Sequence, residues 1–170
     1  MTGHSLFVLG GARSGKSRYA QQRAEALGGR PIYIATAEAH DEEMRDRIAR
    51  HREARDGRWQ TIEAPLDLPA AIDALNAPGA VVLVDCLTLW ITNLLLAGRD
   101  IGQAADMLCA AFRRFNGRLI LVSNEVGFGI VPDNALARRF RDEGGRANQM
   151  VAAVADEVQL VVAGLPMRLK

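Results

Sequence analysis

The sequence Gly10-Gly11-Ala12-Arg13-Ser14-Gly15-Lys16-Ser17 decides the fold of this chain. It follows the apolar run Leu6–Leu9 and precedes Ser17–Leu27, a segment with the composition of a helix. A strand, a glycine-rich turn and a helix in this order, with the spacing G-x-x-x-x-G-K-S, form the pattern of a phosphate-binding P-loop. We therefore expect all eight residues to surround the phosphates of a nucleotide.

Each part of this loop has a chemical task. Glycines allow the backbone to approach a phosphate chain, so that N–H groups can point at its oxygens, and the start of the helix adds its positive dipole end. Lys16 is expected to reach the β- and γ-phosphates, and the Ser17 hydroxyl to ligate Mg²⁺. Of the 21 basic residues only Lys16 and Lys170 are lysines, which suggests that position 16 needs a compact ammonium rather than a planar guanidinium.

Composition is that of a globular protein. The chain has 170 residues, of which 49% are hydrophobic and 24% charged, enough for a single nucleotide-binding domain over residues 1–170. A formal net charge of +1 does not indicate a nucleic-acid surface, and two separated cysteines, Cys86 and Cys109, indicate neither a zinc site nor a disulfide framework. We expect no membrane span, no signal peptide and a cytoplasmic location.

Apolar runs alternate with helical segments along the chain. Strands are expected at Leu6–Leu9, Pro31–Ala35, Trp59–Glu63, Val81–Asp85, Leu119–Ser123 and Glu157–Ala163. Helices are expected at Ser17–Leu27, Asp41–Arg55, Leu68–Leu75, Leu87–Leu96, Gly102–Asn116 and Asn134–Asp156, the last with a break at Gly144-Gly145. The pattern predicts an α/β fold: a P-loop NTPase-like (RecA-like), mostly parallel sheet with helices on both faces.

Ligands of such sheets bind beyond the carboxyl ends of the strands. Val81–Asp85 is an apolar run ending in a carboxylate, which is the form of a Walker B strand whose Asp85 holds Mg²⁺. Thr36, Ala37 and Glu38 follow the second strand and fit a loop that touches a nucleotide, although an ordinary strand-to-helix connection has the same composition. Glu63 ends the third strand, where it could accept hydrogen bonds from a purine edge or remain a solvated carboxylate.

The segment Asp41–Arg55 is the most densely charged part of the chain. Met44, Ile48 and His51 share its apolar face, which must turn toward the protein. His51 is then either a packed histidine, the more common case for this spacing, or a nucleophile or acid–base group that faces the phosphates.

Two later segments allow several interpretations. The loop Gly127–Pro132 combines glycines with apolar residues, which suits a substrate lid, a subunit contact or a plain surface loop. The arginine-rich segment 138–149 could bind a phosphorylated substrate, reach across a subunit interface, or form a solvated helical face.

Together these stretches resemble one known family, the bifunctional adenosylcobinamide kinase / adenosylcobinamide-phosphate guanylyltransferases of cobalamin biosynthesis. The likeness runs over nearly the whole chain. The P-loop is its generic part, and R-I-x-x-H-R at 47–52 and S-N-E-V-G at 123–127 are its specific parts. Further matching motifs are Tyr33–Thr36, D-x-E-M at 41–44, W-x-T-x-E-x-P at 59–65, Asp85–Thr88, Thr92–Leu94 and Arg141–Gln149.

The resemblance implies two activities. A kinase step moves the γ-phosphate of ATP or GTP to the hydroxyl of the aminopropanol arm of adenosylcobinamide. A second step passes GMP from GTP to that phosphate through a guanylylated histidine, here His51, giving adenosyl-GDP-cobinamide and pyrophosphate. The resemblance also implies that the loop Thr36–Glu38 and Glu63 bind guanine and ribose, that Asp85 lies near the nucleotide, and that the protein is a homotrimer.

Two rival interpretations use the same P-loop. A monofunctional kinase of a small metabolite, with a structural His51, predicts phosphoryl transfer that survives His51→Ala. A nucleotide-binding switch predicts no turnover that depends on an acceptor.

Overall fold

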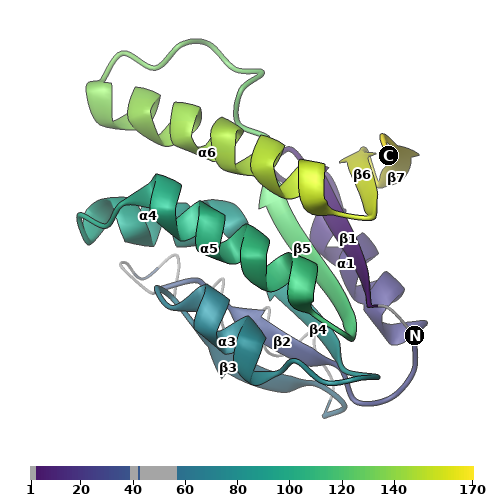
Figure 1. The fold of residues 1–170 in the computed structure, drawn as a ribbon. Coiled ribbons are helices and arrows are strands. Elements are labelled where there is room, and N and C mark those ends of the chain that lie inside the picture. The colour runs from purple at the N-terminus through teal and green to yellow at the C-terminus, as the bar shows by residue number, and fades with distance from the viewer. Residues whose placement is uncertain (1–2, 39–41, 43–56) are drawn as a thin grey trace.

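The computed structural model describes residues 3–38, 42 and 57–170. Its strands are β1 His4–Gly10, β2 Ile32–Ala35, β3 Gln60–Glu63, β4 Val81–Asp85, β5 Arg118–Asn124, β6 Glu157–Val162 and β7 Leu165–Arg168. Within the described part they form one seven-stranded sheet in the order β3-β2-β4-β5-β1-β6-β7 (Figure 1). All neighbouring strands are parallel except β6 and β7, which are antiparallel.

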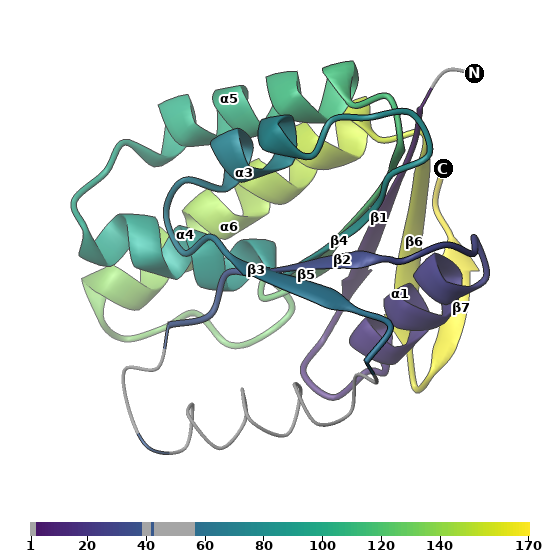
Figure 2. The same ribbon diagram turned by 90° about the horizontal axis from the view of Figure 1, so that it is seen from below.

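Helices cover both faces of this sheet, so the predicted α/β fold is confirmed. On one face lies α1, Lys16–Glu25; on the other lie α3 Leu68–Ala74, α4 Leu87–Leu96, α5 Ile101–Arg114 and α6 Ala135–Val154 (Figure 2). None of the helices that the structure describes is both long enough and apolar enough to cross a membrane.

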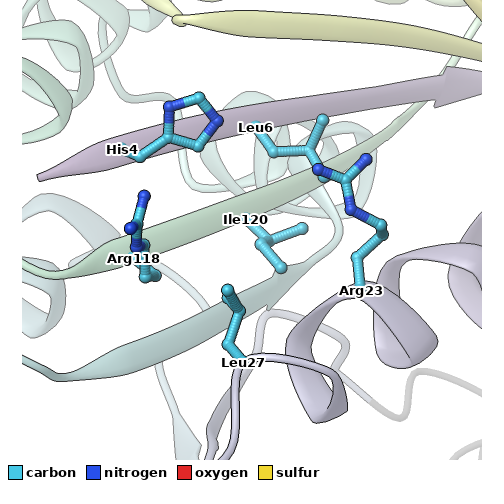
Figure 3. Close-up of a pocket in the computed structure, with 6 residues that line it drawn as sticks. All are labelled: His4, Leu6, Arg23, Leu27, Arg118 and Ile120. Carbon is cyan, nitrogen blue, oxygen red and sulfur yellow. The ribbon is translucent and has the colours of Figure 1, made fainter.

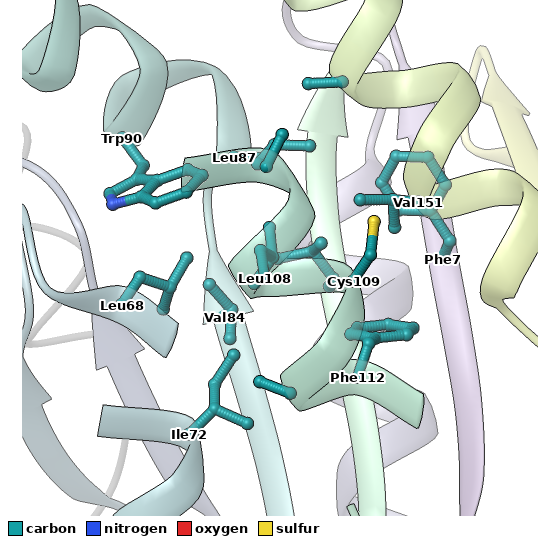
Figure 4. Packing of buried hydrophobic residues seen from close by; sticks show 14 of the residues in the cluster. Phe7, Leu68, Ile72, Val84, Leu87, Trp90, Leu108, Cys109, Phe112 and Val151 are labelled. Atoms are coloured by element: carbon teal, nitrogen blue, oxygen red, sulfur yellow. The ribbon is translucent and has the colours of Figure 1, made fainter. Parts of the chain in front are cut away.

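The two layers explain the continuous apolar runs of the strands. Phe7 and Leu9 of β1 belong to the buried cluster that includes residues of α3–α6, which Figure 4 shows in part. Leu6 and Val8 belong to the smaller cluster against α1. Because successive side chains point to opposite faces, a strand covered on both sides must be apolar at every position.

The predicted break in the last helix is wrong, because α6 runs through Gly144 and Gly145 as one helix of 20 residues. Gly144 is buried where α6 passes the chain after β5, and a Cβ there would lie 3.8 Å from Val126 Cγ2. Each glycine weakens a helix by only about 1 kcal/mol. Burial of Ala147 and Val151 on the same helix outweighs that local preference.

Strand β7 has no counterpart among the predicted elements. It returns beside β6 through a turn at Ala163 and Gly164, which have positive φ angles of 51° and 80°. Gly164 N donates to Ser14 O at 2.7 Å, so this turn is tied to the P-loop. The sequence did not predict this strand because it contains Pro166, and proline is confined largely to edge strands such as β7.

Lys170 caps the carboxyl end of α6. Its ammonium donates to the carbonyl oxygens of Ala152, Ala153 and Ala155 at 3.3, 3.1 and 2.6 Å. Its three donors rotate freely to meet these carbonyls, and the helix dipole favours a cation at this end. The second of the two lysines therefore also occupies a place that suits a compact ammonium.

We expect Lys170→Met to lower Tm by roughly 2–4 °C, the shift produced by losing about 1 kcal/mol in a chain of this length. Methionine keeps the apolar stem and removes only the three donors. Thermal unfolding followed by circular dichroism measures the change. Arg99→Met, which removes an exposed cation outside this cap, is the control and should leave Tm unchanged; equal Tm values for both variants would show that the cap contributes nothing.

Candidate functional site

The P-loop connects the carboxyl end of β1 to the first turn of α1. Gly15, the residue before α1, has a φ of 94°, which glycine adopts without strain, and Arg13 has a φ of 57°. Ser14 N donates to Gly11 O at 3.3 Å, and Tyr19 N donates to Gly15 O at 3.0 Å. The loop thus folds back on itself directly before the helix, and the N-terminus of a helix is where a phosphate is favoured.

Two glycines of the motif are required by close packing. A Cβ on Gly10 would overlap Ser14 Oγ and lie 2.7 Å from Val161 O of the neighbouring strand. A Cβ on Gly15 would lie 3.1 Å from Gly164 Cα in the turn before β7. These positions therefore exclude any larger residue, whereas the space around Gly11 is open within the described structure.

Lys16 and Ser14 place polar groups inside the loop. Lys16 is 9% exposed, and its Nζ donates to Gly11 O at 3.1 Å, so the ammonium lies across the loop. Ser14 Oγ is buried and has no hydrogen-bond partner among the residues described. Such orphaned hydroxyls are uncommon, and a phosphate oxygen bound in the loop would supply the missing acceptor. The loop residues therefore fit a nucleotide.

The strand register brings the other predicted residues to the same side of the sheet as the P-loop, at the carboxyl ends of the parallel strands. Asn124 of β5 pairs with Gly10, and Asp85 ends β4 beside Val122 of β5. One strand, β5, therefore separates the P-loop strand from Asp85. Asp85 Oδ2 accepts a hydrogen bond from the Tyr33 hydroxyl at 3.1 Å. Only the strand order reveals this contact, because Tyr33 lies 52 positions before Asp85 in the chain.

Thr36 is buried, and each of its polar groups is engaged within the protein. Its hydroxyl donates to Cys86 O and accepts from Cys86 N, both at 2.8 Å. Thr36 N donates to Asp85 O at 3.3 Å, and Thr36 O accepts from Asn93 Nδ2 at 2.7 Å. Thr36 thus joins the ends of β2 and β4 and positions the residues that follow it. A direct contact with a nucleotide from Ala37 and Glu38 stays a prediction.

Cys86 follows Asp85, and its thiol is not a candidate nucleophile. Burial, with a smaller contribution from the charge of Asp85, raises the pKa of Cys86 to about 11. The thiol is therefore protonated at neutral pH, and the thiolate is the reactive form. Cys86 and Cys109 are both free and buried.

Glu63 ends β3 in register with Ala35 of β2, and its side chain is exposed. This places its carboxylate at the carboxyl end of β3, beside the end of β2, after which Ala37 and Glu38 follow. A contact of Glu63 with a purine stays a prediction. Farther along the same edge, Glu125 accepts a hydrogen bond from Gly127 N at 2.7 Å and so holds the turn after β5.

The loop after β5 presents apolar side chains to solvent. Phe128 is 87% exposed and Ile130 is 97% exposed. Arg138 donates to Pro132 O and Asp133 O at 2.9 and 2.8 Å, which holds the end of the loop on the start of α6. The loop is therefore braced at its base while its apolar side chains remain uncovered in the described structure.

Two other arginines of α6 have local partners. Arg141 pairs with Asp142 at 3.0 Å, and Arg146 pairs with Glu143 at 3.2 Å. All four residues belong to α6, so these pairs favour the interpretation of a solvated helical face over a phosphate-binding cluster.

Two predictions lie outside the described residues. They are the helix Asp41–Arg55, apart from Glu42, and His51 within it. Both stay predictions from the sequence.

Mg²⁺ suits the donors that the sequence analysis identified. Mg²⁺ favours oxygen ligands and is often held by one or two protein groups together with substrate phosphates and water. Ser17 of α1 and Asp85 of β4 offer such oxygens beside the P-loop and at the end of β4. Among the described residues no three His, Cys, Asp or Glu side chains form a metal cluster, and a magnesium ion held mainly by phosphates does not need one.

A hollow near the amino end of β1 is separate from this site (Figure 3). It is lined by His4, Leu6, Arg23, Leu27, Arg118 and Ile120. Arg23 donates two hydrogen bonds to Glu157 at 2.8 Å each, and this guanidinium lowers the pKa of Glu157 to about 2. The hollow lies near His4, where β1 begins, whereas the P-loop follows the end of β1. The ion pair between Arg23 and Glu157 therefore joins α1 to β6 away from the P-loop.

Comparison with known proteins identifies relatives over nearly the full length. A family model described as cobinamide kinase / cobinamide phosphate guanyltransferase matches residues 6–169. The bifunctional adenosylcobalamin biosynthesis protein CobP of Pseudomonas aeruginosa is 48% identical over 165 residues, covering 96% of this chain and 95% of the relative. CobU of Salmonella typhimurium, with the same description, is 43% identical over 182 residues, covering 97% and 99%.

Solved structures share the fold at low sequence identity. The flagellar accessory protein FlaH of Methanocaldococcus jannaschii has a TM-score of 0.56 and 16% identity, over 99% of this chain and 79% of that one. A Pyrococcus horikoshii protein has a TM-score of 0.58 and 10% identity, over 99% and 87%. These likenesses concern the fold alone, whereas the family match spans the P-loop, Asp85 and the segment that contains His51. The chain therefore belongs to the cobinamide kinase / cobinamide phosphate guanyltransferase family.

Proposed function

We propose that this chain is a bifunctional transferase of cobalamin biosynthesis. It phosphorylates adenosylcobinamide with ATP or GTP and then transfers GMP from GTP to the new phosphate. The observation that carries the proposal is a P-loop with a buried lysine across it and a buried hydroxyl that has no hydrogen-bond partner among the residues described. The relatives of this chain are bifunctional proteins of adenosylcobalamin biosynthesis.

In the kinase step, the residues Gly10–Ser17 hold the phosphate chain of the nucleotide. Lys16 offers its ammonium to the β- and γ-phosphates, and the backbone N–H groups of the loop offer hydrogen bonds. Ser17 and Asp85 would hold Mg²⁺, which, when bound, offsets the charge on the phosphate oxygens. The hydroxyl oxygen of the aminopropanol arm attacks the γ-phosphorus and gives up its proton to solvent, while the bond to the β-phosphate oxygen breaks and the nucleoside diphosphate leaves.

In the guanylyl step, His51 acts as a nucleophile. A neutral imidazole nitrogen attacks the α-phosphorus of GTP, and pyrophosphate leaves. A phosphate oxygen of adenosylcobinamide phosphate then attacks the same phosphorus, the P–N bond breaks, and His51 is regenerated. Ala37, Glu38 and Glu63 would bind guanine and ribose, in a loop that Thr36 positions.

The assembly and location follow from the same resemblance. We expect a homotrimer in the cytoplasm, where ATP and GTP are available. The uncovered side chains of Phe128, Ile130 and Val131 offer apolar surface for a subunit contact. Light scattering should give three times the mass of 18.5 kDa; a monomer at micromolar concentration would contradict the trimer.

Labelled GTP tests the function directly. With Mg²⁺ and α-labelled GTP, the protein should acquire a covalent label that is labile in acid and stable in alkali, as a phosphoramidate is. Adding adenosylcobinamide phosphate should release the label into a corrinoid product. Phosphorylation of adenosylcobinamide without any protein label would leave the monofunctional kinase, and no turnover dependent on an acceptor would contradict both.

A further inference from the structure

A buried chain of hydrogen bonds joins α6 to the carboxyl end of β5. Asn148 of α6 is 5% exposed and uses both ends of its amide. Its Oδ1 accepts from the Ser123 hydroxyl at 2.7 Å, and its Nδ2 donates to Asn124 O at 3.2 Å. Ser123 is itself fully buried. A buried amide satisfied at both ends specifies one arrangement of its neighbours more strictly than apolar packing does.

The chain of hydrogen bonds continues from Asn124 toward Asp85. Asn124 Nδ2 donates to Thr88 Oγ1 at 3.0 Å, and Thr88 is 2% exposed at the start of α4. Thr88 Oγ1 lies 3.1 Å from Cys86 Sγ, which follows Asp85 directly. A path of hydrogen bonds thus runs from the Asn148 side chain through the backbone and side chain of Asn124 to Thr88 and Cys86. Cys86 is the residue after Asp85, whose carboxylate is predicted to hold Mg²⁺.

The same end of β5 also holds the P-loop. Asn124 pairs with Gly10, and Glu125 N donates to Gly10 O at 3.1 Å. Gly10 begins the loop, while the turn after β6 supports its middle through Gly164 N and Ser14 O. The loop therefore has its own support for binding phosphates. Its distance from Asp85, however, depends on where β5 ends.

We propose that Asn148 is a positioning residue for phosphoryl and guanylyl transfer: it holds the end of β5, which keeps the P-loop and Asp85 at their working separation. The inference rests on the proposed function. In the described part of the chain, Asn148 bonds to Ser123 and Asn124 rather than to the P-loop, so it acts through the end of β5. Small residues on the same face of α6, Gly144 and Ala147, are buried beside it and allow the helix to come close enough.

Asn148→Asp and Asn148→Leu test the proposal. Aspartate keeps the acceptor for Ser123 and sets an oxygen against Asn124 O, whereas leucine removes both hydrogen bonds and keeps the number of non-hydrogen side-chain atoms. We expect kcat for phosphorylation of adenosylcobinamide to fall about 10- to 100-fold, because a displacement of about 1 Å at reacting groups costs that much. KM for the nucleotide should change less than about threefold, since the P-loop keeps its own supports. Each rate is divided by the concentration of protein that binds a fluorescent GTP analogue, so that unfolded molecules do not lower the measured kcat.

Asn76→Ala is the matched control. Asn76 also uses both ends of its amide, donating to Arg114 O at 3.0 Å and accepting from Asn116 N at 2.7 Å. It precedes β4, and its partners precede β5, so it lies near the amino ends of these strands, away from the P-loop. It should lower Tm and leave kcat unchanged. Thr88→Val provides a second measurement: combined with Asn148→Leu it should reduce kcat by less than the product of the single effects, because both interrupt one path.

A normal kcat per nucleotide-binding site in both Asn148 variants would overturn the proposal and leave Asn148 a structural residue only. The proposal would also be overturned if kcat/KM fell only because the KM for the nucleotide rose, with kcat unchanged. The Asn148 amide would then support nucleotide binding rather than positioning. A wild-type protein that neither phosphorylates adenosylcobinamide nor takes up GMP would instead overturn the proposed function. If the wild type is inactive in this way, GTP affinity still tests the residue. A loss of affinity of more than tenfold in Asn148→Asp but not in Asn76→Ala would show that Asn148 supports nucleotide binding, which contradicts the positioning role. Unchanged affinity would leave the positioning role without a reaction to support and would overturn it as well.

Discussion

His51→Ala should take up no GMP from α-labelled GTP and form no adenosyl-GDP-cobinamide. Removing a nucleophile that forms a covalent intermediate leaves no group to split the exchange into two displacements, so we expect the guanylyl step to fall by at least about 10³-fold. Phosphorylation of adenosylcobinamide should remain within about threefold of the wild type, because in the proposed mechanism the hydroxyl of the corrinoid arm attacks the γ-phosphate directly.

The labelled protein on a denaturing gel and the corrinoid products separated by chromatography measure the two steps independently. His4→Ala is the control, because His4 lies at the amino end of β1, 3.5 Å from Glu157, and should leave the label intact. A label that persists in His51→Ala would place the intermediate on another residue. Loss of both activities would mean that His51 supports the fold or the nucleotide rather than one chemical step.

Lys16→Met should lower both activities, each by about 10²- to 10³-fold in kcat, the cost of losing one preorganised group that stabilises developing charge. Lys16 is 9% exposed and held across the P-loop by Gly11 O. Its ammonium therefore needs little rearrangement to meet a phosphate. Methionine keeps the stem of the side chain and removes the charge, so the loop should keep its shape.

Lys16→Arg sharpens this test. A guanidinium carries the same charge but is planar and wider than the ammonium, which is buried and lies 3.1 Å from Gly11 O. We expect arginine to restore less than about a tenth of the activity. Steady-state kinetics of both steps, with Tm as a check of folding, give the answer; full activity in Lys16→Arg would show that charge alone is needed, and full activity in Lys16→Met would remove Lys16 from the mechanism.

Local sequence was sufficient for the elements that depend on local chemistry. The P-loop was predictable because a strand, glycines at two crowded positions and a helix start are contiguous in the chain, and Gly10 and Gly15 occupy those positions. Val81–Asp85 and Leu87–Leu96 were predicted at the bounds that the structure shows. The strands β1 and β5 are longer than predicted, as β1 is at His4–Gly10 against Leu6–Leu9, because hydrogen bonding to neighbours extends a strand beyond its apolar run. The strands β2, β3 and β6 each lack one predicted terminal residue.

Strand order, in contrast, is a property of pairs that are far apart in the chain. The sequence does not say that β5 lies between the P-loop strand and Asp85, and this arrangement decides which side chains meet. Tyr33 reaches Asp85, and Asn148 reaches Ser123, only after the sheet has formed. The hydrogen bonds of Thr36 to Cys86 after β4 and to Asn93 of α4 likewise appear only in the tertiary structure, and its contact with a nucleotide stays a prediction.

The two remaining differences have the same cause. The helix α6 continues through Gly144-Gly145 because burial outweighs a local preference, and β7 forms despite Pro166 because it lies at an edge that needs no further partner. The sequence by itself thus determined the phosphate-binding loop, the α/β class and the family, since each rests on motifs or segments that can be read along the chain without knowing which of them pair. The tertiary structure alone decided the neighbours of those residues, because hydrogen bonds and packing between distant segments exist only once the strands are in order.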